Sequence, residues 1–141
     1  MTVAVKRVYE APASRDGARI LVDRLWPRGL SKADAKVDRW FKDLAPSDEL
    51  RQWFHAHAGA FETFRKRYLK ELKRPDAEAA LEELYRLAEK KLTLLFAYKD
   101  EEHNNAVVLK DLLEGRRKPP SGTGPAAIGA GRVRRAARRP R

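Results

Sequence analysis

Residues 23–29 combine two cationic side chains with a carboxylate and an indole. Asp23, Arg24 and Arg28 flank the pair Trp26-Pro27 in this short segment. Each guanidinium offers a planar set of N–H donors that fits two oxygens of a phosphate or carboxylate. The segment therefore predicts a site for an anionic ligand, with Arg24, Trp26 and Arg28 contacting it.

Residues 100–105 supply side chains that could exchange protons. Asp100, His103 and Asn105 lie close together in this polar stretch. Histidine titrates near neutral pH, which suits general acid–base chemistry. We expect Asp23, Asp100 and His103 to be the catalytic candidates. A purely structural alternative has Asp23 neutralising an arginine and His103 helping to cap a helix.

Both segments follow predicted strands. Residues 19–23 and 92–98 are short apolar runs, typical of strands that are buried on both faces. Ligands of open α/β sheets bind outside the carboxyl ends of the strands. A further predicted strand at residues 3–9 adds Lys6 or Arg7 if it neighbours the second strand. We therefore expect the two segments to face each other across one cation-rich cleft.

Helices are predicted on either side of these strands. Capping residues and apolar periodicity place them after Ser31 as far as about Leu44, after Ser47, across 61–72, across 75–88, and from Asn104 or Asn105 to just before Gly115. The pattern predicts an α/β fold with a small, mostly parallel sheet and helices packed on both faces. Three strands are recognisable, and a fourth or an antiparallel edge strand remains possible.

The charge of the chain is unevenly distributed. The formal net charge is +11, but residues 115–141 hold nine basic and no acidic residues, which leaves a net charge of +2 for residues 1–114. The pattern predicts one domain over residues 1–115 and a disordered basic tail over residues 116–141. Such a tail could bind the phosphates of a nucleic acid.

Several classes of site are disfavoured by composition. The chain has no cysteine, which excludes disulfides, thiolate nucleophiles and cysteine metal sites and fits a cytoplasmic location. Asp100 and His103 lack an obvious third metal ligand, so no metal site is predicted. The apolar run from Leu92 to Tyr98 is too short to span a membrane. No glycine-rich phosphate loop or other cofactor motif is present, so the cofactor stays unknown.

Several ordered motifs resemble a known family. Residues 6–9, 23–29, 44–47, 50–54 and 102–106 are similar to the YeaO-like branch of the domain of unknown function 488 (DUF488) family, over about residues 3–114. No established activity accompanies the resemblance. Some wider relatives carry a Cys-His-Arg motif after the last strand, and this chain has no cysteine with which to repeat it. The resemblance implies that the motif positions are Asp23, Arg24, Trp26, Arg28, Lys42, Arg51, Asp100, His103 and Asn105.

These observations lead to one preferred function and two alternatives. The preferred function is an enzyme that binds an anionic small molecule or nucleotide through Arg24, Arg28 and Arg51, with Asp23 or His103 as acid or base. The first alternative is a nucleic-acid-binding protein that uses the basic tail. The second is a non-catalytic protein-interaction domain with Trp26 as its anchor.

Overall fold

A computed structural model describes residues 2–117 of the chain. Its centre is a four-stranded, fully parallel sheet with the strand order β1-β4-β2-β3. The strands are β1 (Val3–Arg7), β2 (Ala18–Leu21), β3 (Arg39–Trp40) and β4 (Leu92–Phe96). The helices are α1 (Lys32–Ala35), α2 (Asp48–Ala56), α3 (Phe61–Glu71), α4 (Pro75–Leu87) and α5 (Asn105–Arg117). The predicted α/β fold is confirmed.

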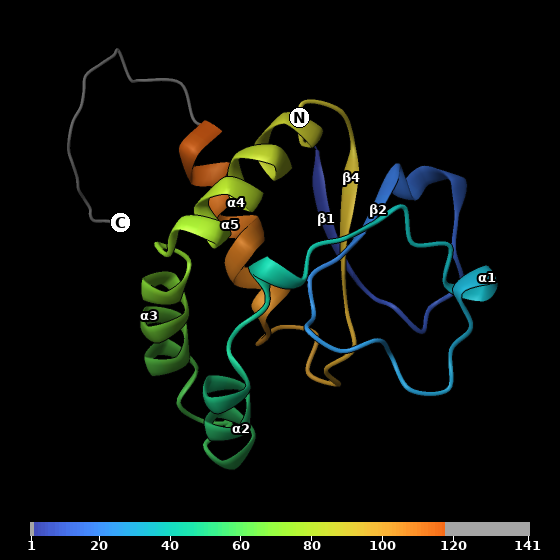
Figure 1. The fold of residues 1–141 in the computed structure, drawn as a ribbon. Coiled ribbons are helices and arrows are strands. Elements are labelled where there is room, and N and C mark those ends of the chain that lie inside the picture. The colour runs from blue at the N-terminus through green and yellow to red at the C-terminus, as the bar shows by residue number, and fades with distance from the viewer. Residues whose placement is uncertain (1, 118–141) are drawn as a thin grey trace.

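The sheet separates two layers of packing. Figure 1 shows α3, α4 and α5 on one side of the strands and α1 on the other. The helical side holds the main core, into which alternate residues of β4, such as Leu92 and Leu94, project. A smaller cluster with Leu21, Ala35 and Leu95 covers the second face. That face is closed by the single-turn helix α1 and the loops around it.

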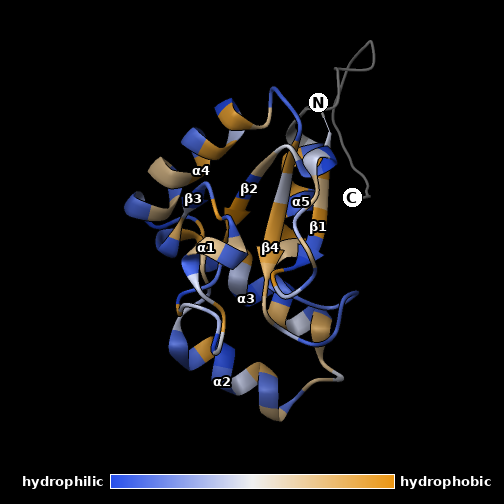
Figure 2. Ribbon diagram, turned by 90° about the vertical axis from the view of Figure 1, so that its right-hand side faces the viewer, coloured by the Kyte–Doolittle hydropathy of each residue, from blue (hydrophilic) through white to orange (hydrophobic). Residues whose placement is uncertain are grey.

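The composition of β4 follows from its central position. It is hydrogen-bonded to β1 on one edge and to β2 on the other. All five of its residues are buried, and the strand is coloured hydrophobic along most of its length in Figure 2. A strand covered on both faces has no solvent-facing side, so its sequence is a continuous apolar run instead of an alternating one.

The predicted helix from Ser31 to about Leu44 is wrong beyond its first turn. Ser31 does cap α1 by accepting a hydrogen bond from the Asp34 N–H, but Lys36 then adopts a left-handed conformation with φ of 50°. After it the chain pairs with β2 as the short edge strand β3. Val37 and Trp40 pack into the second core cluster, and this burial outweighs helix propensity. The fourth strand that the sequence left open is therefore β3.

The starts of α2 and α5 agree with their predicted caps. The Ser47 hydroxyl accepts a hydrogen bond from the Leu50 N–H at the start of α2. The Asn104 side chain accepts one from the Val107 N–H at the start of α5. Gly115 was expected just after the end of this last helix. That prediction is wrong, because α5 continues through Gly115 to Arg117.

The predicted basic tail lies almost entirely outside the described residues. Of residues 116–141, the structure describes the backbone of residues 116 and 117 as the end of α5. In residues 2–117, no helix has the length and apolar character needed to cross a membrane.

Candidate functional site

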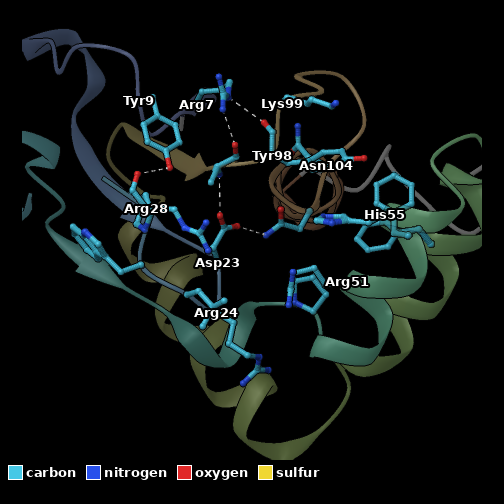
Figure 3. A pocket seen from close by; sticks show the side chains of 18 residues that line it. Arg7, Tyr9, Asp23, Arg24, Arg28, Arg51, His55, Tyr98, Lys99 and Asn104 are labelled. Atoms are coloured by element: carbon cyan, nitrogen blue, oxygen red, sulfur yellow. Dashed lines mark hydrogen bonds between the residues drawn. The ribbon is translucent and has the colours of Figure 1, made fainter. Parts of the chain in front are cut away.

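A pocket of about 580 Å³ lies at the edge of the sheet where β1, β2 and β4 end. This volume is within the range of small-molecule sites, roughly 300–1,000 Å³. The walls come from the segments after these three strands, from α2 and from the first turn of α5 (Figure 3). The polar and aromatic residues that line the pocket include Arg7, Tyr9, Asp23, Arg24, Trp26, Arg28, Arg51, His55, Tyr98, Lys99, Asn104 and Asn105.

The pocket is strongly cationic. Arg7, Arg24, Arg28, Arg51 and Lys99 line it, whereas the lining contains a single carboxylate, that of Asp23. Such an imbalance between low-dielectric walls raises the local concentration of anions.

Arg24 and Arg51 have hydrogen-bonding capacity that the protein does not use. The Nε atoms of both side chains are buried without a hydrogen-bond partner, and they are the two such side-chain atoms in the described part of the chain. Arg51 makes one ion pair, with Asp48 at 3.5 Å, and Asp48 is largely exposed. A buried N–H without an acceptor costs about 1–3 kcal/mol. Both arginines are therefore arranged at a cost that an anion could offset.

Arg7 has a structural role instead. Its guanidinium donates to the carbonyl oxygens of Ala97 and Tyr98, at 2.8 and 3.2 Å. These bonds hold the segment after β4 against the end of β1, as Figure 3 shows. Arg7 thus shapes the pocket wall while contributing positive charge to it.

Asp23 joins three elements beside the pocket. One of its carboxylate oxygens accepts from the Ala97 N–H at 2.9 Å, and the other from the Asn105 side-chain amide at 3.1 Å. Asn105 also donates to the Val22 carbonyl at 2.9 Å. Burial raises the pKa of Asp23 above its ordinary value, and these donors and the charge of Arg51 oppose that rise only in part. Both oxygens are thus bound to internal donors that fix the ends of β2 and β4 relative to α5.

Aromatic side chains form one wall of the pocket. The ring of His55, on α2, stacks on that of Tyr98 with centroids 5.1 Å apart and an interplanar angle of 19°. Phe54 and Phe64 are buried and also line the pocket. Burial and the positive charge of Arg51 lower the pKa of His55, which favours the neutral form of its ring.

Two predicted catalytic residues lie outside the pocket lining. Asp100 and His103 pair with each other across 3.0 Å on the surface, and the His103 ring packs edge-on against Phe61. The Glu102 N–H, together with the N–H and the ring of His103, lowers the pKa of Asp100. Within residues 2–117, no group of three or more His, Cys, Asp or Glu is placed to hold a metal ion.

The remaining predicted ligand-binding residues divide between the pocket and other places. Trp26 lines the pocket, donates to the Leu30 carbonyl and packs edge-on against Trp40. Lys6, on β1, pairs with Asp16 and does not line the pocket. Lys42 lies over the Trp40 ring and does not line the pocket.

Sequence reasoning missed the aromatic wall and Lys99. The sequence alone predicts no role for His55, which lies on α2. The available signal was its spacing from Arg51, because residues four apart share one face of a helix. Tyr98 and Lys99 directly follow β4, and Tyr9 follows β1, so all three are at the edge where ligands bind.

The comparisons with known proteins place the chain in a family. A family model described as "Inactive DUF488-N3 subclade" matches residues 2–126. The uncharacterized protein YeaO of Escherichia coli (strain K12) is 46% identical over 114 residues, which cover 80% of this chain and 97% of YeaO. The uncharacterized protein Rv3073c of Mycobacterium tuberculosis (strain ATCC 25618 / H37Rv) is 44% identical over 115 residues, covering 81% of this chain and 95% of that protein. No solved structure matches the chain. The chain belongs to the DUF488 family, in the YeaO-like group.

Proposed function

We propose that this protein binds a small molecule carrying phosphate or carboxylate oxygens in the pocket at the carboxyl ends of β1, β2 and β4. Arg24 and Arg51 are the principal ligands, and Arg28 and Lys99 add positive charge at the rim. The observation that carries the proposal is the pair of buried, unpartnered Nε atoms on Arg24 and Arg51. Arginines left without acceptors inside a pocket suggest that the acceptor arrives with a ligand.

The proposal concerns binding. The family model that matches this chain describes its subclade as inactive, which favours a ligand-binding protein over an enzyme. The carboxylate of Asp23 is held by two internal donors, and Asp100 and His103 lie outside the pocket lining. The acid–base roles expected for these three residues stay predictions.

Calorimetry and thermal unfolding of the full chain test the proposal. Inorganic phosphate, sulfate and a dicarboxylate are titrated in turn. An anion present at 100 times its Kd should raise the free energy of unfolding by about 2.7 kcal/mol. Replacing Arg24 or Arg51 by Gln should remove this stabilisation, because each change deletes a guanidinium that contacts the anion.

The matched control is Arg86→Gln. Arg86 is an exposed arginine at the end of α4 and lies outside the pocket. The control should bind anions as the native chain does. The proposal fails if none of the three anions stabilises the protein, or if Arg86→Gln weakens binding as much as Arg24→Gln.

A further inference from the structure

The pocket has more apolar surface than an inorganic anion would cover. Leu25 and Tyr9 are the two large hydrophobic side chains that are exposed in the described residues, at 61% and 43%, and both line this pocket. Isolated exposed apolar residues are common, but two at the mouth of one cationic pocket indicate a surface that a ligand covers.

The opposite wall is aromatic. His55 and Tyr98 stack nearly in parallel, and Phe54 packs against Tyr98 with ring centroids 5.6 Å apart. Figure 3 shows Tyr9 and Arg28 on one side of the pocket and His55 on the other. A planar group between these sides would contact aromatic faces as well as the apolar rim. Planar rings gain more from such contacts than a flexible polar chain does.

The aromatic wall adjoins the unpartnered arginines. Arg51 and His55 are four residues apart on α2, so their side chains emerge next to each other on one face of the helix. Burial and the Arg51 charge lower the pKa of His55 and favour its uncharged ring, which leaves the positive charge on this face of α2 with Arg51. An anionic group at Arg24 and Arg51 would thus place an attached ring against His55.

We propose that the anion bound in this pocket is carried by a planar aromatic or heteroaromatic ring, as in a nucleoside monophosphate, with the ring against His55 and Tyr98 and the anionic group at Arg24 and Arg51. This inference rests on the proposed function, because it assigns the part of the ligand that the arginines do not contact.

A series of phosphates distinguishes the ring from the anion. The full chain is titrated with inorganic phosphate, ribose 5-phosphate, phenyl phosphate and the nucleoside 5′-monophosphates. We expect at least one ring-bearing phosphate to bind about tenfold or more tightly than ribose 5-phosphate, a factor equivalent to about 1.4 kcal/mol. Phenyl phosphate and the nucleotides separate a simple aromatic ring from a nucleobase as the preferred group.

Variants connect that preference to the aromatic wall. His55→Ala should remove most of the preference, because it should weaken the binding of ring-bearing phosphates far more than that of inorganic phosphate. His57→Ala is the matched control, since His57 stacks on Trp53 and does not line the pocket. Both histidines are exposed, so neither change should prevent folding.

The outcomes separate this inference from the proposed function. Equal binding of ribose 5-phosphate and all ring-bearing phosphates would overturn the inference and leave anion binding intact. A ring preference that survives His55→Ala would overturn the assignment of the aromatic wall. Failure of every phosphate, inorganic phosphate included, would overturn the proposed function itself.

Discussion

At the scale of single residues, the polar groups of the pocket divide into those that build it and those that remain available. Arg7 donates to the segment after β4, and Asp23 accepts from that segment and from Asn105. Arg24 makes no hydrogen bond or ion pair within the described residues, and its Nε is buried. Both are arginines at the end of a strand, but Arg7 holds the protein together, whereas Arg24 remains available to a ligand.

This difference predicts that removing the Arg24 guanidinium does not lower the stability of the protein but weakens anion binding. Arg24→Met keeps the length of the side chain and removes a buried donor that has no acceptor. Because an unsatisfied buried donor costs about 1–3 kcal/mol, the variant should unfold at an equal or higher urea concentration when no anion is present. It should also lose stabilisation by phosphate. A clear loss of stability without anion would show that Arg24 has a structural partner.

The sequence identified the cationic residues of the site better than its proton-exchanging residues. Asp23 and Arg24 lie two and three residues after the end of β2, so the position of the strand alone brought them to the pocket edge. His103 is seven residues beyond β4, and its direction depends on a turn. In that turn the Asp100 carboxylate accepts from the Glu102 and His103 N–H groups, which leaves the His103 ring on the surface. Periodicity contains no signal for such a turn.

At the scale of elements, the connection between β1 and β2 depends on a buried ion pair. Arg19, on β2, donates to the Asp16 carboxylate at 2.6 Å, and the two residues are 4% and 5% exposed. Lys6 of β1 donates to the same carboxylate at 3.2 Å. Thr93 of β4 donates to the Asp16 carbonyl at 2.7 Å. A residue in a connecting turn therefore joins three strands on the face opposite the main core.

Replacing Asp16 should destabilise the sheet in a pH-dependent way. Asp16→Ala leaves Arg19 buried without its carboxylate, a change that costs about 3 kcal/mol at neutral pH. Burial raises the pKa of Asp16, but the Ala13 N–H and the cations Lys6 and Arg19 outweigh it and hold the pKa below 3.8. The contribution of Asp16 is therefore present above pH 3.8 and is lost as the pH falls through its folded-state pKa.

Urea unfolding at several pH values measures this effect. The difference in free energy of unfolding between the native chain and Asp16→Ala should be largest near pH 7 and should narrow below pH 3.8. Asp43→Ala removes an exposed carboxylate and serves as the control, with a change within about 0.5 kcal/mol. A difference that stays constant down to acid pH would contradict the account of the ion pair.

The elements themselves were predictable where local and tertiary preferences agree. Residues 92–96 form a strand in the apolar run, and α2 and α5 begin where capping residues predict. The region after Ser31 was not predictable, because the cap is real but the helix ends after one turn. What stops it is the pairing of β3 with β2 and the burial of Trp40, which depend on residues about twenty positions away.

At the scale of the whole molecule, the parallel sheet gathers positive charges that the overall composition does not reveal. Residues 1–114 have a net charge of only +2, yet five cationic side chains and one carboxylate line the pocket. The cause is topological: every strand is parallel, so the segments after β1, β2 and β4 meet at one edge. The charge excess of the chain as a whole lies mostly in residues 115–141 and does not contribute to this count.

The most direct test follows the Nε–H signals of the arginines by NMR during a titration of the full chain with phosphate. The account predicts that the signals of Arg24 and Arg51, assigned with the two Gln variants, shift together and saturate at one Kd that matches calorimetry. The Arg86 signal should stay in place. Phosphate that moves neither pocket signal, or moves all arginine signals alike without saturation, would contradict the claim that these two side chains form an anion site.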